Sequence, residues 1–237
     1  MKINVIGSGT MDSSERNNSS FLLDDILIDC GMGTIKSFER QNNKVKDIKY
    51  VLITHYHADH FFDLPNLIIA RKGRKETNEI LYIIGPSDIK EKTEQLMYFS
   101  FNKNYSLKEY ANIEFIALED KETFKFNTFD IQSYNLLHGT CNPNNGYMIK
   151  KQNKVISFTG DTTLCENLYQ MCEKSDIIFI DATKKEETTK GHLSYSAIKD
   201  LSKKYNNCIF YPVHRSDYEI ESTDNIIILN DGDNLEI

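Results

Sequence analysis

The sequence of 237 residues lacks the features of secreted, membrane-spanning and disulfide-stabilised proteins. No run approaches the roughly 18 apolar residues that span a bilayer. The first residues, MKINVIGSGT, contain neither a long apolar stretch nor a small-residue cleavage site, so we expect no signal peptide and no membrane partner. The five cysteines are odd in number and form no CxxC pair. Disulfides are therefore disfavoured, and a cytoplasmic location is expected.

An excess of basic residues is also missing. The chain has 28 Lys and Arg against 35 Asp and Glu, which gives a formal net charge of -7. An acidic chain argues against an extended nucleic-acid-binding surface, although a local basic patch stays open. Some of these carboxylates could be neutralised by bound metal.

No linker rich in Pro, Gly or Ser and no internal repeat interrupts the chain, so residues 1–237 are expected to form a single domain. Runs rich in Ile, Val, Phe and Tyr predict strands, and helical patterns lie between them. Together they predict an α/β fold of αββα type, with two facing mixed sheets and helices outside. The expected strands cover 2–7, 20–23, 26–29, 48–54, 80–84, 112–118, 128–137, 146–150, 154–158, 177–181 and 208–211, and the expected helices 34–41, 64–71, 87–98, 164–173 and 194–205.

The most informative motif is THYHADH at 54–60, which follows the apolar run KYVLI and precedes a helical pattern. Loops at strand ends are places where ligands can converge without breaking a ladder. Alternate residues of the motif can serve one ion while the last two turn towards a second. Imidazole and carboxylate ligands favour zinc, with iron or manganese as alternatives. The four metal-capable residues are His55, His57, Asp59 and His60.

Three more metal-capable residues follow other strand-like runs. NLLH ends at His138, ISFTGD at Asp161 and IFYPVH at His214. A chance group of histidines on a solvated loop would explain a single HxH. The chain has only six histidines, and they lie after several different strand-like runs. A chance group on one loop does not explain this distribution. We therefore expect a metal site recruited from several strand ends.

At these residues the chain resembles the metallo-β-lactamase superfamily, in which HxHxDH, a later His, a later Asp and a final His hold two metals. The resemblance covers nearly the whole chain and keeps the order of the motifs. Asp29, in ILIDCG, resembles the buried acid that supports this site from outside the ligand set; a carboxylate that caps a Gly turn is the alternative. The resemblance implies that the first metal is bound by His55, His57 and His138, the second by Asp59, His60 and His214, and both by Asp161.

Within the superfamily, the chain resembles the ribonuclease Z-like branch of phosphodiesterases. GSGTMDSSERNNSSFLL and then ILIDCGMGT are similar to the opening of that branch. HADHFFDLPNLI resembles its HxDHxxGLPxLL pattern, with Asp63 in place of the usual Gly. NGYMI and FTGDT also match, and IDAT at 180–183 stands where the branch usually has EAT.

GHLSYSAIKDLSKKY resembles the GHSTA segment of this branch, whose His lies beside the scissile phosphate. The resemblance implies that His192 contacts the phosphate or donates a proton to the leaving group. A core or capping histidine is the alternative. It is disfavoured because every other histidine is already assigned as a ligand.

One departure concerns the long basic arm with which ribonuclease Z proper grips the tRNA elbow. That arm lies between the third His and the bridging Asp. Here GTCNPNNGYMIKKQNKVISFTG, enough for two strands and their turns, fills the interval. The missing arm and the acidic charge argue against tRNA 3′ processing. The segment ARKGRKE could supply phosphate contacts, with a solvated helix end as the alternative, through Arg71, Lys72, Arg74 and Lys75.

The expected function is that of a dinuclear metal-dependent hydrolase. It would be a phosphodiesterase acting on small cyclic or activated phosphodiesters or on short RNA. A hydroxide shared by two divalent ions, Zn²⁺ or alternatively Mn²⁺ or Fe²⁺, would attack phosphorus. His192 would donate a proton to the leaving group, and Asp59 or Asp161 would handle the proton of the bridging water. A ribonuclease Z-type endoribonuclease, a lactone or thioester hydrolase on the same site, and a homodimer stay open.

Overall fold

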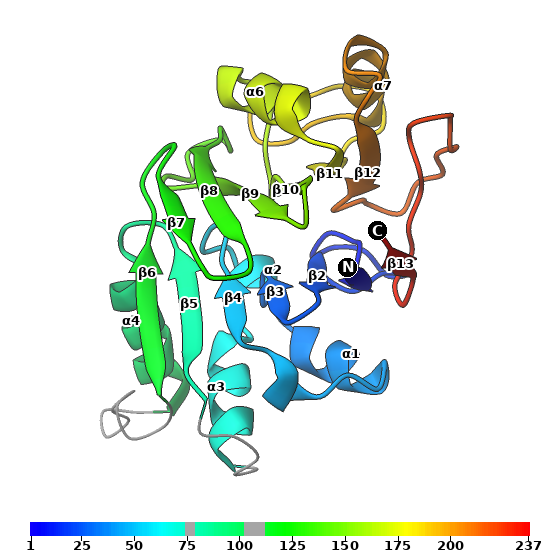
Figure 1. Cartoon of the computed structure of the whole chain (residues 1–237). Helices are drawn as coiled ribbons and strands as arrows, with labels where there is room; N and C mark the ends of the chain where they lie inside the picture. The colour runs from blue at the N-terminus through cyan, green and yellow to red at the C-terminus, as the bar shows by residue number, and fades with distance from the viewer. Residues whose placement is uncertain (74–78, 102–111) are drawn as a thin grey trace.

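The computed structural model describes residues 1–73, 79–101 and 112–237. Its strands form two facing sheets (Figure 1). The strand order is β13-β1-β2-β3-β4-β5-β6 in the first sheet and β12-β11-β10-β9-β8-β7 in the second. The first sheet comprises β1 (Lys2–Gly7), β2 (Ser20–Leu23), β3 (Ile26–Ile28), β4 (Tyr50–Leu52), β5 (Leu81–Gly85), β6 (Ile113–Ala117) and β13 (Asn234–Glu236). The second comprises β7 (Thr123–Lys125), β8 (Asp130–Asn135), β9 (Asn145–Lys151), β10 (Lys154–Phe158), β11 (Ile177–Asp181) and β12 (Ile209–Val213).

Three clusters of buried apolar side chains divide the molecule into layers. The first fills the space between the sheets, where the rings of Phe21, Phe158 and Phe179 contact one another. The other two clusters pack helices against the outer face of each sheet. None of the described helices is long and apolar enough to cross a membrane. The predicted αββα sandwich is confirmed, with α1 (Thr34–Arg40), α3 (Leu64–Gly73) and α4 (Ile89–Phe101) outside the first sheet and α6 (Glu166–Lys174) and α7 (Tyr195–Lys204) outside the second.

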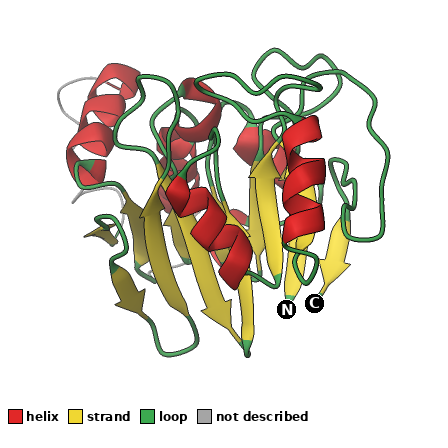
Figure 2. Cartoon of the chain, turned by 90° about the horizontal axis from the view of Figure 1, so that it is seen from above, coloured by secondary structure: helices red, strands yellow, loops and turns green. Residues whose placement is uncertain are grey.

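Strand direction brings the predicted site residues to one edge of the sandwich. In the first sheet, β3 is parallel to β4. In the second, β10, β11 and β12 are parallel, and β8 shares their direction because β9 is antiparallel to both of its neighbours. The carboxyl ends of parallel strands meet at the same edge, where ligands usually bind. Figure 2 shows longer loops at one end of the strands and short turns at the other.

The structure corrects several predicted element boundaries. The strand predicted over 26–29 ends at Ile28, because Asp29 has a φ of 55° in the left-handed region. The strands predicted over 48–54 and 128–137 are shorter, as β4 and β8 show. Sequence patterns missed the exposed edge strand β7, the 3₁₀ turn η1 (Val45–Asp47) and the one-turn helix α2 (Ala58–Phe61).

Two local features define where elements begin and end. The turn at Asp24 and Asp25 joins β2 to β3 as a tight hairpin, with Leu23 paired to Ile26. Ser194 is the N-cap of α7, because its hydroxyl accepts a hydrogen bond from the Ala197 amide at 3.2 Å.

The interval in which ribonuclease Z carries its arm is a plain hairpin here. β9 and β10 are joined by Gln152 and Asn153, with φ values of 49° and 63°. Two consecutive left-handed residues form a tight turn that matches the twist of the flanking strands. The prediction that no arm fits between His138 and Asp161 is therefore confirmed.

Asp63, which replaces the usual Gly of the branch, has a defined structural role. Its carboxylate accepts a hydrogen bond from the amide of Ile35 at 2.8 Å. This amide lies in the first turn of α1, where backbone donors have no partner within the helix. Asp63 thus caps α1 from a segment distant in sequence and ties it to the start of α3.

Candidate metal centre

The HxHxDH segment leaves β4 and enters α2. The sequence predicted a loop for the whole motif, but Asp59 and His60 lie on the helical turn. The turn packs closely on the chain after β3: the amide of Cys30 donates to the carbonyl of His60 at 2.8 Å. Any Cβ at Gly31 would lie 1.7 Å from the carbonyl oxygen of Asp59. The glycine therefore permits the approach that fixes both ligand candidates.

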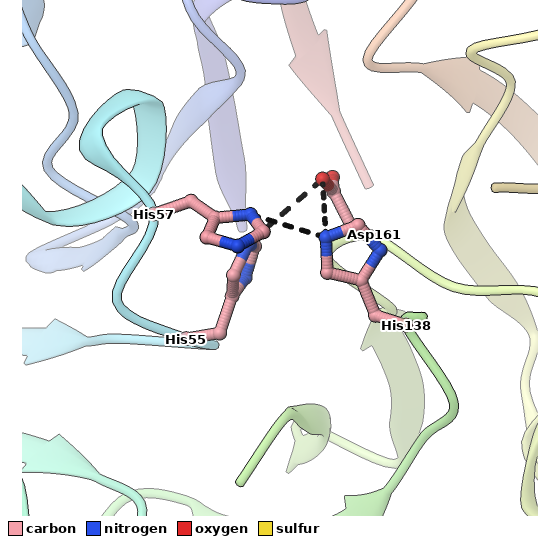
Figure 3. A group of neighbouring side chains, drawn as sticks. All are labelled: His55, His57, His138 and Asp161. Atoms are coloured by element: carbon pink, nitrogen blue, oxygen red, sulfur yellow. Dashed lines mark hydrogen bonds and ion pairs between the residues drawn. The ribbon is translucent and has the colours of Figure 1, made fainter. Parts of the chain in front are cut away.

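One cluster of ligand atoms joins both sheets (Figure 3). Nε2 of His138 lies 3.1 Å from Nδ1 of His57 and 3.5 Å from Oδ2 of Asp161. Nε2 of His55 lies 3.8 Å from the same oxygen. Because Nδ1 of His138 donates to the carbonyl of Gly191 at 2.6 Å, its Nε2 carries a lone pair that faces the other three groups. A cation between these atoms would satisfy all of them.

A second cluster shares Asp161 with the first. Nε2 of His214 lies 3.1 Å from Oδ2 of Asp59. Nε2 of His60 lies 3.2 Å from Oδ1 of Asp161 and 3.5 Å from Oδ2 of Asp59. All four side chains are buried. The seven predicted ligands therefore meet in two groups of four, and Asp161 belongs to both.

Polar atoms at the centre of these groups have no hydrogen-bond partner. They are Nε2 of His55, Nε2 of His60 and Oδ1 of Asp161. Unsatisfied buried polar atoms are costly, so such a set requires an explanation. Imidazole nitrogens and carboxylate oxygens suit zinc and related divalent ions. The donor set and the missing partners therefore both fit a metal centre.

The electrostatics of Asp161 and His55 agree with this interpretation. Although burial raises the pKa of the Asp161 carboxyl, His214 and His60 lower it well below its usual value. Burial and the neighbouring His60 lower the pKa of His55 well below the usual range. Asp161 is thus an anion and His55 a neutral imidazole, which are the forms that bind metal.

Asp29 supports His60 from behind. Its carboxylate lies 2.7 Å from Nδ1 of His60 and accepts hydrogen bonds from the amide and the hydroxyl of Thr54 at 2.8 and 2.9 Å. A carboxylate at Nδ1 fixes the ring and leaves Nε2 free as a ligand. The left-handed backbone of Asp29 turns the side chain to this position. The support that the sequence suggested for Asp29 is seen in the structure.

His192 lies beside the clusters and is held by Asp181. Its Nδ1 is 2.9 Å from Oδ2 of Asp181 and 3.8 Å from Oδ2 of Asp161. Distances alone would let His192 and Asp181 complete a further metal-capable group with Asp161 and His214. Nδ1 is, however, already engaged by Asp181. The sequence placed His192 near the site but did not assign a role to Asp181.

Asp181 is the last residue of β11 and is completely buried. Its carboxylate accepts hydrogen bonds from the amides of Thr162 and Thr183 at 2.9 and 2.8 Å and from the Thr183 hydroxyl at 2.7 Å. These bonds hold it as an acceptor for His192. The IDAT motif contained the signal, since its acid follows a buried strand in the place of the EAT of the branch.

The metal-capable residues open onto a cleft of about 490 Å³. The residues that line the cleft include His57, Asp59, His138 and His192. One wall is formed by Thr10, Met11 and Asp12, within the segment from 8 to 18. Asp217 and Asp231 hold this segment, because their carboxylates accept hydrogen bonds from its backbone amides and side chains.

Arg71 does not contact substrate as the sequence suggested. Its guanidinium is buried and donates to backbone carbonyls, among them those of Ile48 and Glu79. Arg71 therefore anchors α3 to the segment before β4, and it is not a solvated helix end either. The side chain of Lys72 and residues Arg74 and Lys75 lie outside the described parts of the chain.

Comparisons with known proteins confirm the fold and the branch. A curated ribonuclease Z from Staphylococcus carnosus is 31% identical over 159 residues, which cover 63% of this chain and 49% of that protein. The match therefore spans about half of the relative. The short form of human tRNase Z superposes with a TM-score of 0.80 at 19% identity, covering 100% of this chain and 99% of that one. The metallo-β-lactamase fold protein YhfI from Bacillus subtilis gives 0.80 at 17% identity, covering 99% and 98%.

The predicted metallo-β-lactamase fold and the resemblance to the ribonuclease Z-like branch are thus both confirmed. A more specific match comes from the family model described as "Anti-Pycsar protein Apyc1", which covers residues 1–227. This match extends over every strand except β13 and over every metal-capable residue of the two clusters. The chain belongs to the Anti-Pycsar protein Apyc1 family.

Proposed function

We propose that this protein is a metal-dependent phosphodiesterase whose single domain binds two divalent ions. The observation that carries the proposal is the sharing of Asp161 by two groups of buried ligand atoms. A carboxylate between two such groups is the arrangement that a dinuclear hydrolytic site requires. The first ion would be held by His55, His57, His138 and Asp161, and the second by Asp59, His60, His214 and Asp161.

Zinc is the ion that best suits this set of imidazole and carboxylate donors, and manganese and iron(II) are the alternatives. Bound ions of this kind polarise a phosphoryl oxygen and lower the pKa of water towards neutrality. The protein contributes the orientation of the ligands. Asp29 fixes His60, and the carbonyl of Gly191 fixes His138.

The residues that move protons line the cleft. His192 has a side chain that is 24% exposed, and its Nδ1 is tied to Asp181. We assign it the role of proton donor to the leaving oxygen, because a positioned imidazole beside the phosphate can protonate an alkoxide as it departs. Asp59 also lines the cleft and is assigned to accept the proton of the attacking water.

The cleft favours a small or single-stranded substrate. Its volume of about 490 Å³ is within the usual range of small-molecule sites. The hairpin turn at Gln152 and Asn153 leaves no arm to hold a folded RNA. The net charge of -7 disfavours a long polyanion. We therefore rank small cyclic or activated diesters first and short RNA second.

Processing of tRNA 3′ ends is the second candidate, because the curated relatives that match this chain are named ribonuclease Z. Hydrolysis of a lactone or thioester on the same metal centre is the third. The GHLS segment argues against the third candidate, since it resembles the phosphodiesterase branch.

The family description also gives the activity a biological setting. It describes its members as anti-Pycsar proteins, and we extend this role to the present chain. Expression in cells that carry Pycsar, with an inactive Asp161→Ala variant as the control, tests the extension. Loss of Pycsar activity with the wild type alone is expected. If the wild type and the Asp161→Ala variant reduced Pycsar activity equally, the anti-Pycsar role would not depend on hydrolysis at this site.

Substitution of Asp29 should weaken metal binding. In Asp29→Asn, the amide oxygen can still accept from Thr54, but the NH₂ group then faces Nδ1–H of His60. The imidazole of His60 must then either lose the tautomer with the proton on Nδ1, which leaves Nε2 free to bind metal, or rotate away from residue 29. We expect zinc affinity to fall by about 10- to 100-fold in chelator competition. Asp63→Asn, a carboxylate outside the site, is the control. Unchanged affinity in Asp29→Asn would contradict the role of Asp29.

The wild type should carry two metal ions per chain after reconstitution. Asp161→Ala should disturb both ions because its carboxylate is shared, whereas His214→Ala should mainly weaken the second. Elemental analysis of each purified, reconstituted protein measures this. One ion or fewer per wild-type chain would overturn the dinuclear proposal.

Removal of the imidazole at 192 should separate catalysis from metal binding. His192→Ala should keep the metal content of the wild type and lose about 10²-fold in turnover, as expected for a positioned acid. Asp181→Asn should show a smaller loss, because the ring stays but is less well held. Loss of metal from His192→Ala would mean that it is a ligand, and unaltered turnover would mean that its role is structural.

A panel of substrates tests the reaction class itself. Bis(p-nitrophenyl) phosphate, cyclic nucleotides, short RNAs, a tRNA precursor, lactones and thioesters should be compared at steady state with zinc and with manganese. We expect the highest kcat/KM for small diesters. Efficient site-specific cleavage of the precursor at submicromolar concentration would favour the ribonuclease role. Activity confined to lactones or thioesters would refute the phosphodiesterase.

A further inference from the structure

Lys184 occupies a special position in the cleft. It follows Thr183, whose hydroxyl lies 3.1 Å from Nδ1 of His192 and 2.8 Å from Nδ1 of His214. Among the described residues that line the cleft, Lys184 is the sole Lys or Arg. The other ionisable side chains there are the carboxylates of Asp12, Asp59 and Asp161 and the imidazoles.

The backbone of Lys184 is held on both sides. Its amide donates to the carbonyl of Leu193 at 3.1 Å. Its carbonyl accepts from the amide of Tyr195 at 2.7 Å and from the hydroxyl of Tyr218 at 3.0 Å. The Cα atom is therefore fixed beside the site, and only the flexible stem and the ammonium group can adjust.

The ammonium group has no assigned task within the protein. Some lysines elsewhere have partners: Lys151 pairs with Asp24, and Lys174 donates to the hydroxyl of Tyr134. Within residues 1–73, 79–101 and 112–237, the exposed side chain of Lys184 makes no hydrogen bond, ion pair or ring contact. Its charge is available to a ligand, and no internal contact must be broken to use it.

We propose that Lys184 binds a non-bridging oxygen of the substrate phosphate and selects anionic phosphodiesters over neutral esters. This inference rests on the phosphodiesterase function proposed above. A diester keeps a negative charge in the bound state, whereas a lactone or thioester has none. In a cleft lined by carboxylates, a single ammonium group offers a charge-assisted hydrogen bond that only the anion can accept. Lysine is suited to this task as a mobile point charge.

The test compares Lys184→Ala and Lys184→Arg with the matched control Lys185→Ala. Lys185 is the next residue and is also exposed, but it does not line the cleft. With bis(p-nitrophenyl) phosphate, we expect Lys184→Ala to raise KM about tenfold with little change in kcat, because the contact acts equally on bound substrate and transition state. Lys184→Arg should restore most of the loss, and Lys185→Ala should match the wild type. Metal content should be equal in all four proteins.

A binding experiment gives a second readout that does not depend on turnover. Inorganic phosphate is titrated calorimetrically into the zinc-loaded wild type and variants. Lys184→Ala should bind it about tenfold more weakly than the wild type, and Lys185→Ala equally well. Wild-type affinity in Lys184→Ala, equal losses in the two alanine variants, or loss of zinc from Lys184→Ala would each overturn the assignment. A wild type inactive on every diester would refute the proposed function, while the phosphate titration would still decide the role of Lys184.

Discussion

The carboxylate of Asp161 is buried between histidines that come from different parts of the chain, and the rest of the site depends on this contact. Its Oδ1 lies 3.2 Å from Nε2 of His60 and 3.2 Å from Nδ1 of His214, and its Oδ2 lies 3.5 Å from Nε2 of His138. An anion with 2% exposure is tolerable only where positive groups compensate it. His60 belongs to the first sheet and the other two histidines to the second. The site therefore exists only when both sheets are packed.

Contacts between the sheets explain how this packing is kept in register next to the ligands. The hydroxyl of Tyr147, on β9, donates to the carbonyl of Ile53 at 2.7 Å, and the amide of Asn145 donates to the carbonyl of Thr54 at 2.9 Å. Both bonds cross from the second sheet to the chain just before His55. Beneath them lie the aromatic rings of the core between the sheets. The ligand geometry is thus set by buried structure rather than by the loops themselves.

Some features of the fold could be predicted from the sequence and others could not, and the difference has a physical cause. Strands buried on both faces appear in the sequence as continuous apolar runs. The layers of the fold and the residues that follow each strand could therefore be predicted. Features fixed by distant contacts were not. α2 depends on close packing against Gly31, and Arg71 is drawn inside by carbonyls of a segment far away in sequence. The role of Asp181 also required the fold, because its partner His192 belongs to a different loop.

One fold can host many activities, so the choice of substrate must depend on the walls of the cleft. Here one of these walls is held by hydrogen bonds to two carboxylates. Asp217 and Asp231 tie the segment from 8 to 18, which contributes Thr10, Met11 and Asp12 to the cleft, to the end of the chain. A cleft of about 490 Å³ has the size of a small-molecule site. The proposed preference for small diesters therefore rests on the size of the cleft and on the residues that line it.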